Sequence, residues 1–337
     1  MDLPTIYDVA LKSGFSATTV SKAFNDYPDI STKTKNEILK VAKEMGYLPN
    51  SHARTILTKK SWTVGVLYLE SSGRGIKHPF FNAVIEGFKE SMESKGYDLM
   101  FVSKDIGNGK FSYLEHCQFR SIDGVIIVHS DYHNEDVQEL LRSDIPCVLI
   151  DMESEHGSTV CSDNYRGGIE ALDYLYSLGH RDIAHISGGD DTFSGPKRRE
   201  GFTQALKQYR LPIRAEWIVD GGYFTYDSGY QAMQALLNLA ESPTAVFVAG
   251  DYMALGAIQA IKDRGLRVPQ DISVIGFDDI ELAQYTTPKL TTIRQNTKCI
   301  GGKAADILME AIDSKETISM NMIPTKLIVR ESCQSIK

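Results

Sequence analysis

Two carboxylates and one arginine stand near the expected ends of buried strands, in positions suited to binding chemistry. Asp251 follows a strand predicted at 245–249, and Asp278 follows a strand predicted at 272–277. Arg198 lies just inside a helix predicted at 196–208. A guanidinium can hold two vicinal hydroxyls or a carboxylate in its fork, and a carboxylate accepts hydrogen bonds from hydroxyls. Because ligands of open α/β sheets bind outside the carboxyl ends of strands, these residues indicate a site for a polyhydroxylated molecule.

Aromatic and hydroxyl side chains accompany this group. Phe80 and Phe81 stand at the start of the helix that follows the first predicted strand, and Thr192 and Ser194 follow a strand predicted at 183–186. Aromatic faces stack on the apolar face of a sugar ring or on a base, although one of the two phenylalanines can instead belong to the core. The residues therefore favour a sugar and leave a nucleobase as the alternative.

Paired carboxylates can also perform acid–base chemistry, as in an enzyme acting on a sugar. No nucleophile, metal cluster or glycine-rich phosphate loop accompanies them, and the adjacent Asp278 and Asp279 point opposite ways at a strand end. We therefore interpret Asp278 as an acceptor for ligand hydroxyls and Asp279 as a helix cap. The eight His and five Cys show no ligand spacing, so we predict no catalytic residue, no metal and no cofactor.

Composition limits the class of protein. The chain has 337 residues, of which 42% are hydrophobic and 24% charged, enough for about two or three globular domains. A disordered or collagen-like chain is excluded. No apolar run approaches the roughly 18 residues of a membrane span, and no signal peptide is visible at the N-terminus. The odd, scattered cysteines fit a reducing cytoplasm.

Charge is distributed unevenly along the chain. Residues 1–60 carry nine Lys and Arg against six Asp and Glu, whereas the remainder carries 27 against 38, for a net charge of −8 overall. A basic head on an acidic body indicates that the head binds a polyanion, although a short window can also be basic by chance.

The sequence of the basic head predicts three short helices, each preceded by a residue that can cap it. Thr5 can cap a helix beginning at residue 6, with Asp8 completing a capping box, and Gly14 can end it. Ser16 can cap a second helix, about 17–25, and Ser31 a third, about 32–45. Two short helices joined by a tight turn and braced by a third form a helix-turn-helix.

The outer face of the second helix suits DNA. Thr18, Thr19, Ser21 and Lys22 are left outside its apolar stripe. Hydroxyls contact phosphates or bases, and lysine favours guanine in the major groove. The alternative is that any three-helix bundle has a polar outer face.

The head resembles that of the lactose/galactose-repressor (LacI/GalR) family of bacterial transcription regulators. The resemblance rests on TIYDVALKSGFSATTVSKAFND and on ISTKTKNEILKVAKEMGYLPNSHART. The phrases DNYRGG, LGHRDIAHISG, RVPQDISVIGFDD and PKLTTIRQN also recur in that family, so the resemblance covers the whole chain. It implies that Ala17, Thr18 and Lys22 read bases. Phosphate contacts then fall to Ser16, Thr19, Ser21 and Asn25, with Thr5 at the start of the head.

Residues 50–61 resemble the family's hinge helix and linker. Such a helix pairs with that of a dimer mate in the minor groove, where an apolar residue wedges between base steps. Ile56 stands at the usual wedge position with Leu57 beside it, and either can intercalate; a plain linker is the alternative. The hinge residues assigned to DNA are Ser51, Ala53, Arg54, Ile56 and Leu57.

From residue 62 onward, strands and helices alternate in two successive cycles, which indicates parallel sheets. The fold expected is an all-α helix-turn-helix head followed by an α/β periplasmic-binding-protein-like body of two doubly wound parallel-sheet lobes. We place the head at 1–49, the first lobe at 62–161 with 292–321, and the second lobe at 162–291 with 322–337. The chain then crosses between the lobes near 161–163, 290–293 and 320–323.

The resemblance also completes the ligand site. It puts an arginine of the effector site at Arg198 and a second stacking aromatic at Phe224, or at Tyr223 if the loop is displaced by one residue. The predicted effector contacts are Phe80, Phe81, Thr192, Ser194, Arg198, Phe224, Asp251 and Asp278.

The resemblance implies a cytoplasmic, nucleoid-associated repressor with no membrane partner. It is expected to bind a pseudo-palindromic operator DNA as a homodimer, switched by a small-molecule effector in the cleft between the lobes. The effector is expected to be a sugar or sugar derivative, and less readily a purine. The rival interpretation is a sugar-binding protein without a DNA-binding role.

Overall fold

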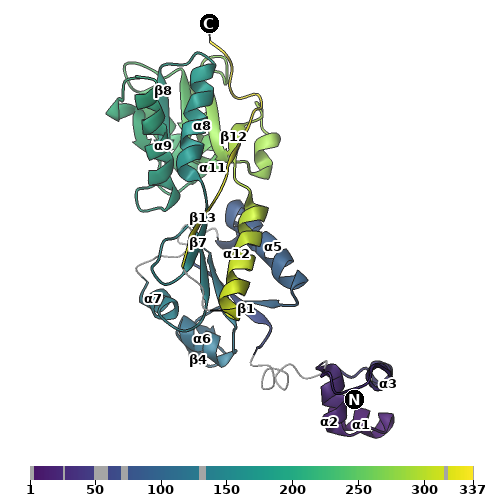
Figure 1. The fold of residues 1–337 in the computed structure, drawn as a ribbon. Helices are drawn as coiled ribbons and strands as arrows, with labels where there is room; N and C mark the ends of the chain where they lie inside the picture. The colour runs from purple at the N-terminus through teal and green to yellow at the C-terminus, as the bar shows by residue number, and fades with distance from the viewer. Residues whose placement is uncertain are drawn as a thin grey trace.

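The computed structural model describes residues 4–25, 27–48, 60–69, 75–128, 134–314 and 318–336. The head consists of α1 (Ile6–Ser13), α2 (Ala17–Phe24) and α3 (Thr32–Met45). The three helices enclose a small core of Val9, Val20, Ala23, Ile38 and Ala42 (Figure 1).

The predicted caps of the head are confirmed. The Thr5, Ser16 and Ser31 hydroxyls each accept a hydrogen bond from the backbone N–H three residues later, and Asp8 closes the capping box on Thr5. Gly14 ends α1 with a φ of 75°. Each cap satisfies backbone groups that a helix end leaves unpaired, so these short helices begin where the sequence predicts.

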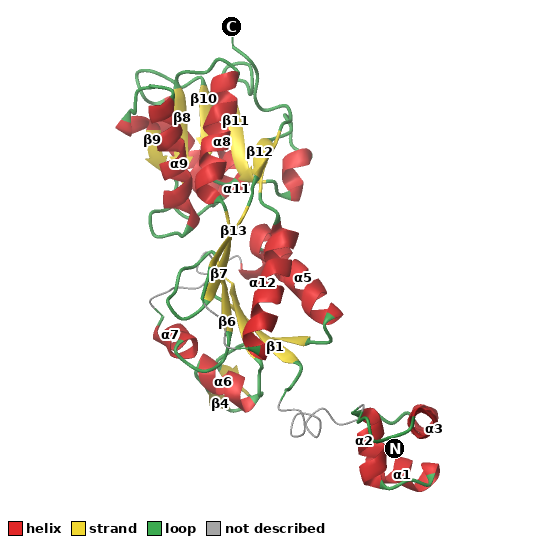
Figure 2. Cartoon of the chain, viewed as in Figure 1, coloured by secondary structure: helices red, strands yellow, loops and turns green. Residues whose placement is uncertain are grey.

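The first lobe is built on a six-stranded sheet in which all strands are parallel, in the order β13-β7-β6-β5-β1-β2. The strands are β1 (Thr63–Tyr68), β2 (Asp98–Phe101), β5 (Gly124–Val128), β6 (Cys147–Ile150), β7 (Ser158–Ser162) and β13 (Met320–Ile323). One face is covered by α5 (Pro79–Ser94) and α12 (Thr297–Asp313), and the other by α6 (Tyr113–Phe119) and α7 (Glu135–Leu141) (Figure 2). A small hairpin, β3 (Asp105–Ile106) and β4 (Gly109–Lys110), and a turn, η1 (Gly75–Lys77), complete the lobe.

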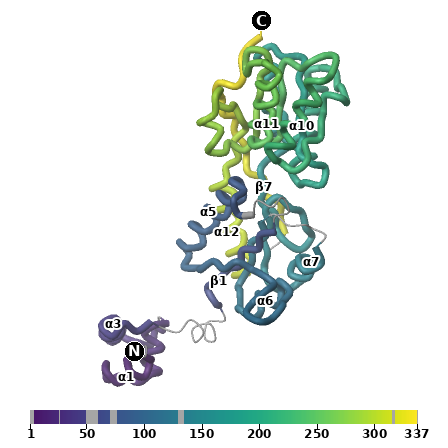
Figure 3. Tube along the Cα trace, turned by 180° about the vertical axis from the view of Figure 1, so that it is seen from behind, coloured from purple at the N-terminus to yellow at the C-terminus, as the bar shows by residue number. Residues whose placement is uncertain are grey.

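The second lobe has the sheet order β14-β12-β11-β10-β8-β9, in which only the pairing of β14 with β12 is antiparallel. The strands are β8 (Ile183–Ser187), β9 (Ile218–Asp220), β10 (Ala245–Val248), β11 (Ser273–Asp278), β12 (Thr291–Arg294) and β14 (Lys326–Ile328). One face is covered by α8 (Asn164–Ser177) and α9 (Ser194–Gln208) (Figure 1). The other face is covered by α10 (Tyr226–Leu237) and α11 (Asp251–Asp263) (Figure 3). Short turns η2 (Ala215–Trp217) and η3 (Glu281–Gln284) join these elements. The predicted fold class of head and two sheet lobes is confirmed.

Three segments connect the lobes: Asp163 between β7 and α8, residues 295–296 between β12 and α12, and residues 324–325 between β13 and β14. The first lies within the range predicted for a crossing. The other two come later than predicted, because β12 belongs to the second sheet up to Arg294 and β13 to the first sheet up to Ile323. The predicted lobe boundaries after 161, 291 and 321 therefore cut through β7, β12 and β13. Within the described part of the chain, no helix is long and apolar enough to cross a lipid bilayer.

Candidate functional site

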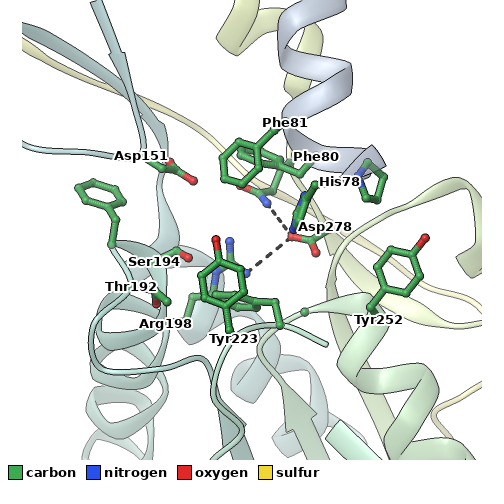
Figure 4. A pocket seen from close by; sticks show the side chains of 15 residues that line it. His78, Phe80, Phe81, Asp151, Thr192, Ser194, Arg198, Tyr223, Tyr252 and Asp278 are labelled. Atoms are coloured by element: carbon green, nitrogen blue, oxygen red, sulfur yellow. Dashed lines mark hydrogen bonds and ion pairs between the residues drawn. The ribbon is translucent and has the colours of Figure 1, made fainter. Parts of the chain in front are cut away.

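A cavity lies between the lobes, beyond the carboxyl ends of strands from both sheets. Its empty space, which includes open solvent at the mouth, amounts to about 620 Å³. Aromatic rings, two aspartates and one arginine converge on it (Figure 4). The lining residues are His78, Pro79, Phe80, Phe81, Asp151, Thr192, Phe193, Ser194, Arg198, Tyr223, Phe224, Gly250, Tyr252, Asp278 and Gln295.

Arg198 on α9 is held rigidly at the floor of this cavity. Its side chain is 3% exposed, and Nε donates a hydrogen bond to Asn164 Oδ1 at 2.8 Å while Nη1 donates to the Ala249 carbonyl. The guanidinium carbon also lies 3.6 Å from the centroid of the Phe277 ring. These contacts occupy Nε and Nη1, and among the described residues Nη2 has no hydrogen-bond partner. The arginine is therefore oriented in advance, with donors left for a ligand.

Asp278 faces Arg198 from the end of β11. Its Oδ1 lies 3.6 Å from Arg198 Nη1 and accepts a hydrogen bond from Gln295 Nε2 at 2.6 Å. Burial raises the pKa of Asp278 to about 6, although Arg198 and Gln295 both favour the ionised form. The carboxylate is thus a buried acceptor beside a fixed guanidinium, a pairing suited to neighbouring hydroxyls on a ligand.

Asp151, at the end of β6, brings a second carboxylate to the cavity from the first lobe. It is 9% exposed, and Oδ1 has no hydrogen-bond partner among the described residues. Burial raises the pKa of Asp151 to about 7, with Arg198 and Lys197 opposing this rise and Asp278 adding to it. Asp151 was not among the predicted site residues, although it directly follows the buried strand β6.

Asp251, predicted as an effector contact, does not line the cavity. It is fully buried at the start of α11, where Thr292 Oγ1 donates to Oδ1 at 2.7 Å and the Ile280 N–H donates to Oδ2 at 3.0 Å. Its carboxylate packs against Gly276, where an added Cβ would lie 2.2 Å from Oδ1. Asp251 therefore joins the start of α11 to Thr292 on β12 and to the backbone of Ile280, and it is not among the lining residues.

Asp279, predicted as a helix cap, has a different role. The following turn η3 is preceded by Ile280, and Asp279 lies between two arginines. Arg294 Nε donates to its Oδ2 and Arg330 Nη2 to its Oδ1, both at 2.6 Å. The prediction was wrong because both partners come from the neighbouring strand and the C-terminal segment, which local spacing does not reveal.

The predicted aromatic residues meet at the cavity. Phe80 and Phe81 lie with ring centroids 5.0 Å apart at an interplanar angle of 70°, and both line it. Phe224 and Tyr223, the two alternatives for the second stacking aromatic residue, both line it as well. Gly188 leaves the space that the Phe224 ring occupies, because a Cβ there would lie 2.3 Å from Phe224 Cζ.

The two predicted hydroxyl residues also reach the cavity. Thr192 Oγ1 donates to the Gly189 carbonyl at 2.7 Å and accepts from the Gly195 N–H at 3.1 Å, so its hydroxyl shapes the loop before α9. Ser194 begins that helix and is 8% exposed.

Gln295 was also missed. It occupies the second connection between the lobes, lines the cavity, and is 4% exposed. The predicted crossing near 290–293 could have identified Gln295, because a residue in a connection between the lobes lies close to the cleft, but the predicted range ended two residues before it. His78, Phe193 and Tyr252 complete the lining. Within the described ranges, no group of His, Cys, Asp or Glu side chains could hold a metal ion.

The predicted DNA-facing residues of α2 form a polar surface away from the head core. Thr18 is exposed, and Ala17, Thr19, Ser21 and Lys22 are partly exposed. Lys22 forms an ion pair with Asp29. Asn25 Nδ2 donates to the Ser21 carbonyl at 2.8 Å, and Thr5 Oγ1 donates to Asp8 at 2.7 Å. The hinge assignments Ser51, Ala53, Arg54, Ile56 and Leu57 lie outside the described residues.

Comparison with family models finds two matches. Residues 5–50 match the model of bacterial regulatory proteins, lacI family, and residues 172–333 match a periplasmic binding protein-like domain.

Curated proteins resemble the chain along nearly its whole length. The probable HTH-type transcriptional repressor ExuR of Bacillus subtilis (strain 168) is 37% identical over 336 residues, covering 98% of this chain and 99% of that protein. The HTH-type transcriptional repressor PurR of Erwinia tasmaniensis is 37% identical over 342 residues, covering 98% and 97%.

Solved structures show the same arrangement. The lac repressor dimer bound to operator and the anti-inducer ONPF superposes with a TM-score of 0.82 at 25% identity, covering 99% of this chain and 100% of that one. The complex of the transcriptional regulator CelR with cellobiose gives a TM-score of 0.71 at 29% identity, covering 98% and 99%.

Proposed function

The chain belongs to the lacI family of bacterial regulatory proteins, and from this premise we propose that it is a transcriptional repressor switched by a small molecule. The observation that carries the proposal is that one chain joins a capped helix-turn-helix to two lobes with a polar and aromatic cavity between them. The similar proteins are repressors, which favours regulation over catalysis and over sugar binding without DNA.

DNA recognition falls to the outer face of α2. Thr18 and Lys22 lie one turn apart, opposite the buried Val20 and Ala23. In the free head Lys22 is paired with Asp29, so binding exchanges this ion pair for a base edge. Ala17 stands beside them. The remaining polar residues, Thr5, Ser16, Thr19, Ser21 and Asn25, contact phosphates.

One head reads only a half-site, so the repressor binds as a homodimer on a pseudo-palindromic operator. The hinge residues Ser51, Ala53, Arg54, Ile56 and Leu57 contact the minor groove between the half-sites. Ile56 or Leu57 supplies the wedge. Because a repressor acts on chromosomal DNA, the protein is expected in the cytoplasm, associated with the nucleoid.

Two residues that line the cavity form hydrogen bonds with residues in or next to the connections between the lobes. Arg198 Nε bonds Asn164, the first residue after the first connection, at 2.8 Å. Asp278 Oδ1 accepts from Gln295, within the second connection, at 2.6 Å. A ligand that binds Arg198 and Asp278 therefore acts on atoms bonded to two of the segments on which the lobes turn. It switches the repressor only to the extent that it prefers one arrangement of the lobes.

The effector is a sugar or sugar derivative. Aromatic faces from Phe80, Phe81 and Phe224 suit the apolar face of a sugar ring, and Arg198 with Asp278 suits its hydroxyls. Among the hydroxyl side chains, Thr192 and Ser194 border the same space. A purine is the second candidate, because stacked aromatic rings also bind a planar base.

The test is a binding selection with full-length protein and a random DNA library, followed by fluorescence anisotropy on the selected site. We expect a pseudo-palindrome, and Lys22→Ala should change the preferred base at one position of each half-site. Lys43→Ala, in the last turn of α3, is the control and should leave that preference unchanged. Wild-type binding without sequence preference would refute the repressor proposal.

A further inference from the structure

We propose that Asp123 is a positioning residue for DNA recognition. It fixes the direction in which the chain leaves the first lobe toward the head, and so sets the separation of half-sites that a dimer accepts. This inference rests on the proposed homodimeric repressor and adds the geometry of its operator. Asp123 immediately precedes β5, at the amino ends of the parallel strands of the first lobe. The cavity lies beyond the carboxyl ends of strands, and Asp123 does not line it.

The carboxylate of Asp123 holds the backbone of the exit segment, residues 60–62, which leads into β1. Its Oδ1 accepts a hydrogen bond from the Ser61 N–H at 2.8 Å, and its Oδ2 accepts one from the Trp62 N–H at 2.9 Å. Hydrogen bonds from backbone N–H groups to a carboxylate are stronger than those to a neutral acceptor. Because one side chain binds two consecutive N–H groups, it fixes the direction of the exit segment as well as its position.

The backbone of Trp62 is held in an uncommon conformation. Its φ is 59°, in the left-handed region that residues other than glycine rarely adopt. Such a conformation persists only where the surrounding contacts hold it. Here the Trp62 carbonyl accepts from the Asp98 N–H at 2.8 Å, and the indole lies with its centroid 5.2 Å from that of Tyr97. Asp123 supplies the remaining contact of this backbone, on its N–H side.

Helix α12 ties the exit segment to the body of the first lobe. Its last residue, Asp313, forms an ion pair with Lys60. Leu308 of the same helix packs against Gly124, the residue after Asp123, where an added Cβ would lie 2.9 Å from Leu308 Cδ1. Figure 2 shows α12 running from between the lobes toward β1. The chain therefore leaves the first lobe in a direction that is fixed relative to a tightly packed helix.

Two exit segments, one from each protomer of the proposed dimer, determine where the two heads lie on the operator. Each added base pair moves a half-site by about 3.4 Å along the duplex and turns it by about 35° around the duplex axis. A fixed exit segment matches one separation of half-sites, and any other separation requires the chain to bend where Asp123 holds it. Without this carboxylate the exit segment is freer, and the heads reach several separations.

The experiment uses anisotropy titrations of the full chain on its selected palindrome and on versions that are one or two base pairs longer or shorter at the centre. Wild type should lose roughly tenfold or more in affinity for a change of one base pair, because the two heads no longer engage together. Asp123→Ala should bind the original site more weakly, but lose less than about threefold when the spacing changes. Asp123→Asn retains one acceptor oxygen and should fall between the two.

A variant that had only lost stability would bind more weakly by the same factor at every spacing. Glu139→Ala, which changes an exposed acid on α7 of the same lobe, is the matched control and should keep the wild-type spacing preference. A second measurement needs no DNA. In a Trp217→Phe background, the fluorescence anisotropy decay of Trp62 should gain a larger fast component when Asp123 is replaced by alanine. Circular dichroism checks that each variant folds.

Three outcomes would overturn the inference alone. These are an Asp123→Ala protein that discriminates between spacings as sharply as wild type, an unchanged Trp62 decay in that variant, or a wild type that binds its palindrome equally well at every spacing. Wild-type binding without any palindrome would instead refute the proposed repressor, and this inference with it.

Discussion

Replacing Arg198 by methionine should destabilise the second lobe, and the loss should depend on pH. Methionine keeps much of the apolar stem but removes the guanidinium from Asn164, from the Ala249 carbonyl and from Asp278. The change leaves a buried carboxylate without its counter-charge. Removing one partner of a buried pair is more costly than removing both.

The magnitude follows from the geometry of the pair. Two unit charges separated by 3.6 Å interact by about 5 kcal/mol at an effective dielectric constant of about 20. Water in the open cavity screens part of this energy, so we expect a loss of roughly 2–3 kcal/mol at pH 8. Burial has already raised the pKa of Asp278 to about 6, and losing Arg198 raises it further. At pH 5 Asp278 is mostly protonated with or without Arg198, so the charge-dependent loss should largely disappear.

The assay uses the two tryptophans of the chain, Trp62 in the first lobe and Trp217 in the second. In a Trp62→Phe background, Trp217 fluorescence reports urea unfolding of the second lobe alone. A double-mutant cycle of Arg198→Met with Asp278→Asn should show a coupling energy of about 1–3 kcal/mol at pH 8.

The control is Arg199→Met, on the same helix. Its ion pair with Asp190 is exposed, so its loss should cost at most about 1 kcal/mol at either pH. Additivity of the Arg198 and Asp278 substitutions within about 0.5 kcal/mol would refute the reasoning. An Arg198→Met loss that is equal at pH 5 and pH 8 would do the same.

Three further expectations concern the cavity, its connection and the hinge. Gln295→Ala removes the amide donor to Asp278 and should weaken the effect of a bound sugar on operator affinity severalfold, with operator affinity in the absence of sugar unchanged in anisotropy titrations. Because folding raises the pKa of Asp151 from 3.8 to about 7, its contribution to stability is present below pH 4 and is lost as pH rises through 7. Asp151→Asn without ligand should therefore lose less thermal stability than wild type between pH 4 and pH 8, and parallel melting curves would contradict this. Ile56→Ala should weaken specific DNA binding more than non-specific binding, whereas equal losses would point to Leu57 or to no wedge.

The structure of the head was predictable because its determinants are local. Thr5, Ser16 and Ser31 cap helices whose first N–H groups lie three residues away, and Gly14 adopts the left-handed turn that ends α1. Such contacts need no information about distant residues. The alternation of strands and helices in the body likewise predicted parallel sheets.

The rule that ligands bind beyond the carboxyl ends of strands predicted the cavity lining less completely. It correctly placed Asp278 on the lining but also selected Asp251, whose carboxylate is buried and accepts hydrogen bonds from Thr292 and the Ile280 N–H. It applied equally to Asp151, which was not among the predicted site residues. The three aspartates look alike in sequence, because each follows an apolar strand.

Local sequence was sufficient to set the helix caps, the alternation that makes two sheets, and the residue types available for binding. Tertiary structure alone decided which of those residues share the cavity. Asp151 and Arg198 come from different lobes, and Gln295 reaches Asp278 from a connection whose position depends on where β12 ends. A side chain at a strand end faces a ligand only if the neighbouring strand and the following helix leave it no nearer partner. Those neighbours are set by the order of strands in the sheet, which brings together residues far apart in the chain.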